Sequence, residues 1–356
     1  MKTVTVKKKI LFITEYSNEI ASARYRVYQY IPLLKKTGYD IKILFRAKNF
    51  SNSGKFLRVY RGISFLLKIL LYIPWYDCIM FQKYYSRSIF VNWLFRRLSK
   101  RLIFDFDDAI YATLKGECLS ADSASVRSLN YFIRNADEVS VVSTYLYNYS
   151  KKFNAHVTVI PTVVDVDKCL SYKKAKIKNR DTDRVRIGWI GSTGGDIFLG
   201  SITSVFDKLF DNYGRKVELI IISEKPFELT TRIETKHITW KLSKETDYFL
   251  DIDIGIMPLP DNERTRGKGG FKLIQYMAFG IPSVASPVGI NREIITDGIN
   301  GFLADTEEEW IEKLSLLIES DELRLMFATN GYDIVREKFD ISVGFNKLIS
   351  LLEKSH

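Results

Sequence analysis

The chain has 356 residues and a formal net charge of +11; 46% of its residues are hydrophobic and 27% are charged. This balance excludes a disordered chain, and the length exceeds what one ordinary core fills, so we expect two domains of about 150–200 residues each. The three cysteines, Cys78, Cys118 and Cys169, show no metal-ligand spacing, which predicts reduced thiols in a cytoplasmic protein.

Charge is distributed unevenly along the chain. Residues 1–180 hold 32 lysines and arginines against 13 acidic residues, which leaves 21 against 29 for the remainder. A basic half predicts a polyanionic partner: anionic lipid headgroups, nucleic acid or a phosphorylated substrate. No aromatic RNA-binding strand and no helix-turn-helix signal accompanies the charge, so we expect no nucleic-acid partner.

Strand and helix signals alternate through the first half. Short apolar runs predict strands at 10–14, 41–45, 78–82, 102–106, 138–142 and 157–160. Helical spacing predicts helices over 23–36 and 91–98 and another that ends at 131–136. Such alternation predicts a doubly wound α/β domain, which we place at residues 1–180.

The segment 56–74 mixes basic residues with large apolar ones. The apolar run at 63–76 contains Lys68 and is shorter than the roughly 20 residues that span a bilayer. A basic, apolar helix of this kind lies in a membrane interface, or packs on a core with a wet basic face. The predicted membrane patch consists of Lys55, Arg58, Arg61, Lys68, Arg96 and Arg97.

A second α/β pattern follows a lysine-rich stretch at 165–183, which we interpret as a linker. Strands are predicted at 185–190, 217–223, 238–240, 252–257, 283–285 and 302–304, and helices at 199–212, 271–279, 307–319 and 322–337. We place the second domain at 181–340. The tail, 341–356, is predicted to be a helix that crosses back to the first domain.

The segment from Arg264 to Phe302 holds the strongest sign of a binding site. Two glycines, Gly269 and Gly270, open a helix, where free N–H groups and the helix dipole favour an anion. Four basic side chains surround the pair: Arg264, Arg266, Lys268 and Lys272. This combination suits a diphosphate, although an ordinary solvated loop has the same composition.

The order of residues after this loop resembles the C-terminal signature of retaining glycosyltransferase family 4, which has the GT-B fold. The matching residues are Tyr276 to Ser286, then Gly289, Glu293 and the turn Asn300-Gly301-Phe302-Leu303. The first half resembles the family more loosely, through residues 21–26 and 104–108. The resemblance implies an α/β fold of two Rossmann-like domains that face a central cleft.

The resemblance also implies an activity. The enzyme would move a hexose or N-acetylhexosamine from a nucleotide diphosphate sugar, UDP-sugar favoured and GDP-sugar possible, to a hydroxyl of a glycan or lipid-linked acceptor. It would retain the anomeric configuration and need no metal or other cofactor. The setting it implies is the synthesis of bacterial surface polysaccharide such as lipopolysaccharide, by a cytoplasmic protein peripheral to the inner membrane face.

The chain departs from the family pattern at two positions. Gln275 stands where the family has the Glu that binds ribose, and Gly267 stands where it has the Glu that contacts the donor sugar. A glutamine amide still donates and accepts hydrogen bonds with a ribose diol. Two alternatives stay open beside the transferase: a nucleotide-sugar epimerase of the same fold, and a non-catalytic GT-B partner subunit.

Candidate site residues fall into three sets. The donor set consists of Gly191, Ser192, Thr193, Arg264, Lys268, Gly269, Gly270, Lys272, Gln275 and Glu293. Asp105, Asp107 and Asp108 end a strand at the edge where open α/β sheets bind ligands, so they are candidates to position the acceptor hydroxyl or act as base, or else to cap a helix. Arg24 and Arg26 are candidate ligands of acceptor or phosphate.

Overall fold

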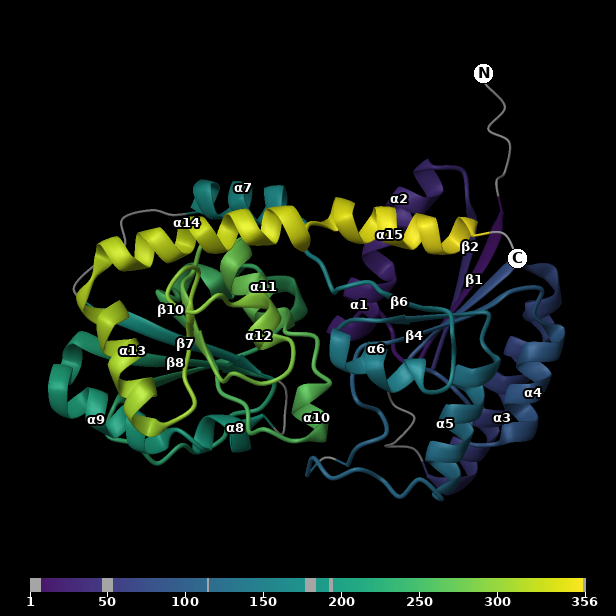
Figure 1. Cartoon of the computed structure of the whole chain (residues 1–356), viewed down its shortest axis with the longest axis horizontal. Helices are drawn as coiled ribbons and strands as arrows, with labels where there is room; N and C mark the ends of the chain where they lie inside the picture. Colours follow the sequence, from purple (N-terminus) through teal and green to yellow (C-terminus); the bar gives the residue numbers. More distant parts are fainter. Residues whose placement is uncertain (1–7, 47–53, 114, 177–183, 192–194, 355–356) are drawn as a thin grey trace. The chain divides into compact units, whose positions relative to one another are not determined.

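The computed structural model describes residues 8–46, 54–113, 115–176, 184–191 and 195–354. The chain forms two compact units (Figure 1). The first comprises residues 1–162, 267–269 and 344–356, and the second comprises 163–266 and 270–343. The main division therefore comes after Thr162, before the boundary that the sequence predicts at 180.

A parallel sheet of six strands organises the first unit. The strands are β1 (Lys9–Thr14), β2 (Asp40–Phe45), β3 (Cys78–Gln82), β4 (Leu102–Phe106), β5 (Glu138–Val141) and β6 (Val157–Val159), in the order β2-β1-β3-β4-β5-β6. Ile10 lies opposite both Ile41 and Cys78, which fixes the register of three neighbouring strands. Because all strands run the same way, their carboxyl ends share one edge of the sheet.

Helices flank this sheet. They are α1 (Ala21–Arg26), α2 (Ile31–Lys36), α3 (Lys55–Tyr72), α4 (Ile89–Leu98), α5 (Ala124–Asn135) and α6 (Thr144–Lys151), with α3, α4 and α5 side by side (Figure 1). The single helix predicted over 23–36 is wrong: the chain breaks at Val27, whose φ is −128°, and passes through a 3-10 turn. Pro32 explains part of this, because a proline removes an N–H that a continuous helix needs.

The second unit repeats the plan with a different strand order. Its strands are β7 (Val185–Gly191), β8 (Val217–Ser223), β9 (Glu234–Thr239), β10 (Ile254–Met257), β11 (Ser283–Ala285) and β12 (Phe302–Leu303), in the order β12-β11-β10-β7-β8-β9, all parallel. Its helices are α7 (Val166–Lys176), α8 (Asp196–Gly200), α9 (Thr203–Tyr213), α10 (Glu263–Arg266), α11 (Phe271–Ala278), α12 (Asn291–Ile294), α13 (Glu307–Glu319) and α14 (Asp321–Lys338). The predicted doubly wound α/β class is confirmed in both units.

The stretch predicted as a linker is largely helical. Within 165–183, residues 166–176 form α7, and residues 177–183 lie outside the described part of the chain. The Asp165 carboxylate accepts a hydrogen bond from Lys168 N at 3.0 Å, as a helix-capping side chain does. The lysine-rich composition therefore marks a helix with a polar surface at this point.

The last helix, α15 (Ile341–Glu353), ends within the first unit. Its terminal carbonyls are held by Arg101, whose two terminal nitrogens donate to Leu352 O at 2.7 Å and Leu351 O at 2.6 Å. A cation at this position complements the negative end of the helix dipole. The C-terminal residues thereby become part of the first unit's packing.

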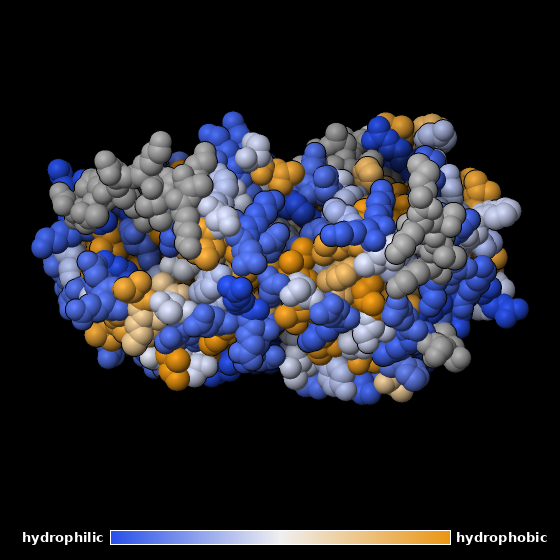
Figure 2. All heavy atoms as spheres, turned by 90° about the horizontal axis from the view of Figure 1, so that it is seen from above, coloured by the Kyte–Doolittle hydropathy of each residue, from blue (hydrophilic) through white to orange (hydrophobic). Residues whose placement is uncertain are grey.

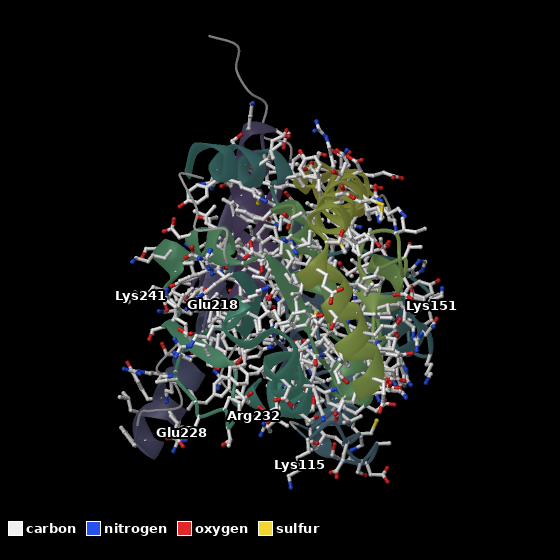
Figure 3. The ribbon with its side chains drawn as sticks, turned by 90° about the vertical axis from the view of Figure 1, so that its left-hand side faces the viewer. Lys115, Lys151, Glu218, Glu228, Arg232 and Lys241 are labelled. Carbon is white, nitrogen blue, oxygen red and sulfur yellow. The ribbon has the colours of Figure 1, made fainter. Side chains whose placement is uncertain are left out.

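Charged side chains lie mostly at the periphery. Arg232, labelled in Figure 3, pairs with Asp211 at 2.7 Å on the surface of the second unit. On the face shown in Figure 2, hydrophobic residues form small groups among hydrophilic ones. No helix within the described residues has the length and the hydropathy needed to cross a membrane.

Candidate functional site

The predicted acidic residues lie at the carboxyl edge of the first sheet, but the structure separates Asp105 from the other two. Asp105 is fully buried and is paired through both carboxylate oxygens with Arg26, which is itself buried. Arg26 also donates to Ile160 O and to Ser140 Oγ. All three guanidinium nitrogens of Arg26 are therefore engaged, and this pair acts as a structural tie between α1 and β4.

Arg24 is likewise engaged in holding the chain. One of its terminal nitrogens donates to Asn18 O at 2.8 Å and to Glu19 O at 3.0 Å. These carbonyls belong to the turn between β1 and α1. The sequence predicts that Arg24 and Arg26 both bind phosphate or the acceptor. In the structure, Arg24 instead holds the turn after β1, and Arg26 pairs with the buried carboxylate of Asp105 on β4.

Asp107 and Asp108 face a lysine that the sequence analysis did not select. Lys83 Nζ lies 3.3 Å from Asp107 Oδ1 and is hydrogen-bonded to Asp108 Oδ2. Lys83 follows β3 directly, and its φ of +57° makes it the only non-glycine residue with a positive φ among those the structure describes. Such a conformation costs a non-glycine residue of order 1–3 kcal/mol and is common at functional sites.

The charge on Lys83 is strongly favoured. Burial alone would lower its pKa, but the carboxylates of Asp107 and Asp108 outweigh burial, and the pKa is raised above its usual value. A charged residue directly after a buried strand was the signal available in the sequence for Lys83. The same signal applies to Glu15, which follows β1.

Glu15 extends this charged edge toward β2. Its carboxylate pairs with Arg46 at 3.0 Å, and burial raises its pKa despite the pull of Arg46 in the other direction. Its backbone N–H donates to Gln82 O at 3.2 Å, which ties the ends of β1 and β3 together. The carboxyl edge of the first sheet is thus a row of ionised side chains, with Asp108 the most exposed carboxylate of the Lys83 group.

In the second unit, the predicted donor residues gather around α11. Gly270 precedes the helix with a φ of +63°, and a Cβ added there would lie 2.4 Å from Ile294 Cδ1 and 2.8 Å from Ile290 Cγ2. Both the backbone conformation and the close approach of α12 therefore require glycine. The glycine-opened helix predicted from the sequence is present at the predicted position.

Lys272, in the first turn of α11, reaches back to β7. Its Nζ lies 4.6 Å from the centre of the Trp189 ring, in a cation–π contact. The ring of Trp189 in turn covers Gly191, where an added Cβ would lie 1.8 Å from Trp189 Cη2. The structure therefore brings together Gly191 and Lys272, two residues of the predicted donor set, through a buried tryptophan.

Gln275 lies one turn further along α11 and is 8% exposed. No described side chain or backbone group hydrogen-bonds to its side-chain amide, so the amide can meet a ligand. Its neighbour Tyr276 is fully buried, and the Tyr276 hydroxyl bonds to Gly188 O and Ile190 N on β7. In the sequence, Tyr276 stands out only as the first residue of the motif that runs to Ser286, and nothing there indicates this contact.

The remaining donor candidates are dispersed. Arg264 is half-buried on α10, and Glu293 is exposed on α12. Lys268 and Gly269 belong to the first unit. Ser192 and Thr193 lie outside the described residues. Arg266, beside Arg264, forms a bidentate pair with Asp261 at 2.6 and 3.0 Å.

Three of the six residues of the predicted membrane patch are exposed in the structure. Arg58, Lys68 and Arg97 are exposed, whereas Arg61 is half-buried and Arg96 pairs with Asp137 at 2.7 Å. The side chain of Lys55 lies outside the described side chains. Arg96 is thus a tie between α4 and the start of β5, which its position in a basic cluster did not reveal.

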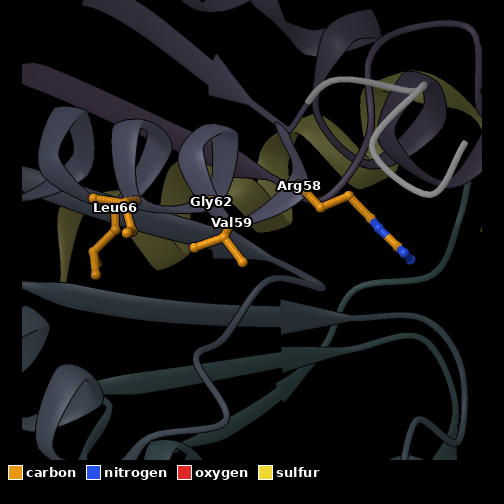
Figure 4. A pocket seen from close by; sticks show the side chains of 5 residues that line it. Arg58, Val59, Gly62 and Leu66 are labelled. Carbon is orange, nitrogen blue, oxygen red and sulfur yellow. The ribbon is translucent and has the colours of Figure 1, made fainter. Parts of the chain in front are cut away.

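Large apolar side chains accompany the exposed cations. Those of α3 recur on one side of the helix at Phe56, Tyr60, Ile63, Leu67 and Leu71, and Trp75 follows; α4 adds Phe90 and Trp93. A hollow of about 370 Å³ opens along α3, lined by Arg58, Val59, Gly62, Ile63 and Leu66, with Arg58 extending away at one end (Figure 4). α3 therefore has an exposed apolar face as well as the face that packs on the core of the first unit.

Metal ligands are not clustered in the described residues. In that part of the chain, no three histidine, cysteine, aspartate or glutamate side chains lie close enough together to hold a metal ion. Asp105 and Asp107, whose Asp-x-Asp spacing also occurs in metal sites, are engaged by Arg26 and Lys83 respectively.

Comparisons with known proteins agree on one fold. A family model described as "Glycosyl transferases group 1" matches residues 208–334. Sucrose-phosphate synthase from Thermosynechococcus elongatus has a TM-score of 0.74 at 14% identity, covering 97% of this chain and 98% of its own. A glycosyltransferase from Rickettsia africae has a TM-score of 0.69 at 13% identity, covering 98% and 100%.

The protein HepE from Anabaena, in complex with UDP and glucose, has a TM-score of 0.66 at 14% identity and covers 97% of this chain and 99% of its own. No curated protein sequence matches the chain. At these identities the structural likeness shows the fold, which is GT-B with two Rossmann-like domains.

Proposed function

We propose that this chain, a GT-B glycosyltransferase whose residues 208–334 form a group 1 glycosyltransferase domain, moves a hexose or N-acetylhexosamine from a nucleotide diphosphate sugar to a hydroxyl of a glycan or lipid-linked acceptor. The reaction retains the anomeric configuration and proceeds without a metal ion. Its setting is the synthesis of bacterial surface polysaccharide.

The observation that carries this proposal is the arrangement around α11. A helix of eight residues begins after a glycine that cannot be replaced without strain, and Lys272 lies in its first turn, over the ring of Trp189. A helix N-terminus with a cation beside it stabilises the diphosphate charge that grows as the sugar leaves. Because these groups are already positioned, they need little reorganisation during the reaction.

The other roles follow from the same helix and from the first sheet. The Gln275 amide has no hydrogen-bond partner among the residues that the structure describes, and it is one turn from Lys272, which suits a ribose diol. Arg264 adds positive charge near the diphosphate. Asp107 and Asp108, on the ligand-binding edge of the first sheet, position the acceptor hydroxyl or take its proton.

A UDP-sugar is the favoured donor, with a GDP-sugar as the second choice. The neighbours support this preference: HepE was solved with UDP-glucose, and an α-glucosyltransferase of the same fold, 13% identical with a TM-score of 0.65, was solved with UDP.

The exposed face of α3 supports an anionic membrane as the surface where the acceptor is met. Its apolar stripe is joined by Arg58 and Lys68, and between residues 41 and 76 the chain has no acidic residue. Apolar burial and attraction to anionic headgroups then add, and each lysine or arginine near the surface contributes about 1 kcal/mol. A peripheral position on the inner face of a membrane follows from this proposal.

A nucleotide panel tests the proposed function directly. Thermal unfolding is followed with UDP, GDP, ADP and CMP, each with and without EDTA. A nucleotide at about 100 times its dissociation constant stabilises the bound protein by roughly 2.7 kcal/mol, which is easily measured. We expect UDP to stabilise the protein equally with and without EDTA; stabilisation by none of the four would favour a non-catalytic partner subunit.

Two further measurements address the finer parts of the proposal. The anomeric configuration of the sugar, read by NMR in the product or in the slow hydrolysis product of the donor, distinguishes retention from inversion. Flotation with vesicles of phosphatidylglycerol and with neutral vesicles at low salt tests the membrane. Equal recovery with both kinds of vesicle, or with neither, would contradict the role given to the basic residues of α3.

A further inference from the structure

The hydroxyl of Tyr276 occupies the place of a missing strand residue beside β7. It donates to Gly188 O and accepts from Ile190 N, each at 3.2 Å. In a parallel sheet, a residue opposite position i donates to the carbonyl of i−1 and accepts from the N–H of i+1. A single side-chain oxygen of Tyr276 therefore makes both contacts that a neighbouring strand would make opposite Trp189.

The neighbouring strand stops short of this point. β10 pairs with β7 only as far as Gly188, although β7 continues to Gly191 on its other side, against β8. Asp253 N donates to Arg186 O, which shows that the backbone groups of alternate residues from 186 onward face β10. Beyond Gly188 the described pairing of β7 with β10 ends, and there the Tyr276 hydroxyl supplies the partner of Ile190 N.

Space for this contact is built into β10. A Cβ added at Gly255 would lie 2.5 Å from Tyr276 Cδ2, so the ring is seated directly on the glycine backbone. Tyr276 is fully buried, and burial raises the pKa of its hydroxyl, which keeps the O–H proton available as a donor. The Tyr276 ring thus packs against Gly255 while its hydroxyl bonds to the end of β7.

We infer that Tyr276 is a positioning residue for the donor site: its hydroxyl fixes the carboxyl end of β7 to α11, so that Gly191, Lys272 and Gln275 keep one geometry. The inference rests on the proposed function. Tyr276 lies on the same helix as Lys272 and Gln275, and Lys272 contacts the ring of Trp189, the residue that Tyr276 bridges. Tyr276 itself touches no ligand in this scheme.

The chain contains a matched control. Tyr248 is also buried, and its hydroxyl accepts from Lys241 N at 2.7 Å and donates to Thr239 O at 3.1 Å, at the end of β9. It makes the same two backbone contacts with the same spacing, but β9 is the edge strand, two places from β7. Tyr248→Phe therefore loses the same chemistry away from α11.

The experiment compares Tyr276→Phe, Tyr248→Phe and the wild type by calorimetric titration with UDP, with thermal unfolding of each protein. Loss of a neutral hydrogen bond that positions ligand groups corresponds to about a fivefold to tenfold change in dissociation constant. We expect Tyr276→Phe to bind UDP about fivefold to tenfold more weakly, while Tyr248→Phe binds as the wild type does. Both variants should lose similar thermal stability.

Hydrogen exchange supplies a readout that does not need a ligand. Without nucleotide, Tyr276→Phe should speed amide exchange in peptides that cover the end of β7, and UDP should no longer slow it to the wild-type rate. If Tyr276→Phe binds UDP as tightly as the wild type, or no more weakly than Tyr248→Phe, the inference is overturned while the proposed function stands. If the wild type binds no nucleoside diphosphate, both fall.

Discussion

The carboxyl edges of the two sheets are built from different materials. In the first unit the edge consists of ionised side chains in pairs: Arg26 with Asp105, Lys83 with Asp107 and Asp108, and Glu15 with Arg46. In the second unit the corresponding strand, β7, ends in glycine, a tryptophan ring and a tyrosine hydroxyl. Charge organises one edge, and volume and backbone geometry organise the other.

The difference predicts how each edge fails. A charge-built edge is sensitive to the loss of a single partner, because the remaining buried ion has neither water nor counterion. A glycine-built edge is sensitive to the addition of a single methyl group, because rings and helices already occupy the space. The proposed division of labour agrees with this, since an acceptor hydroxyl needs a carboxylate and a diphosphate needs backbone amides and a cation.

Breaking the Arg26–Asp105 pair should have the largest effect. Asp105→Asn keeps the size of the side chain and leaves the Arg26 guanidinium buried without its counterion, and removing one partner of a buried pair costs about 3–5 kcal/mol. Asp108→Asn removes a carboxylate that is 42% exposed, where an ion pair contributes at most about 1 kcal/mol. Urea unfolding of the two variants measures both. Comparable losses in the two variants would show that burial does not distinguish these pairs.

On the glycine-built edge, Gly270→Ala is the corresponding change. A left-handed residue with a side chain costs about 1–2 kcal/mol, and the overlap with Ile294 and Ile290 adds to it, so we expect a loss of about 2–4 kcal/mol in unfolding free energy. UDP affinity should fall with it. Gly298→Ala is the matched control: its φ is +75°, but nothing lies within 4 Å of the added Cβ.

Gly298→Ala should therefore show the conformational cost alone, about 1–2 kcal/mol. The gap between the two glycine variants then measures the close approach of α12 to the start of α11. Equal losses would mean that Ile290 and Ile294 move aside, and that the edge is less tightly packed than the structure indicates.

Most of the fold was predictable because the sheets are buried on both faces. Continuous apolar runs marked the strands, and eleven of the twelve agreed with the observed strands to within two residues at each end. The run at 238–240 marked only the end of β9, whose first residues, Glu234 to Lys236, are exposed. The helix over 23–36 was wrong because apolar spacing continues across Val27 while the helical backbone does not. Apolar spacing shows which side of a segment is buried. A break in the helix that keeps the same side buried therefore leaves the spacing unchanged.

The candidate site was predictable where chemistry depends on local spacing. Gly270, Lys272 and Gln275 lie within one segment, so one pattern showed all three. Lys83 and Tyr276 were missed because their partners, Asp107 and the end of β7, are brought to them by sheet order, which a single sequence does not reveal. Asp105 shows the converse, since three aspartates in four residues read as one site and the structure divides them between a buried pair and an open one.

The smallest expected effect concerns the charge of Lys83. Asp107 and Asp108 raise its pKa above the usual 10.5, against the opposing effect of burial. A base whose pKa is raised on folding contributes stability that is complete below its usual pKa and is lost as the pH rises through the raised value.

Lys83→Met should therefore be less stable than the wild type by about 1 kcal/mol between pH 7 and 10, as for a partly exposed pair. Above about pH 10.5 the gap should shrink, because Lys83 of the unfolded wild type then loses its proton whereas the folded protein keeps it. Urea unfolding of both proteins between pH 7 and 11.5 measures the gap, and subtracting one protein from the other cancels the titration of the remaining lysines and tyrosines. A gap that stays constant across this range would mean that Lys83 stabilises the edge by packing its methylene groups, and that Asp107 and Asp108 keep their positions without it.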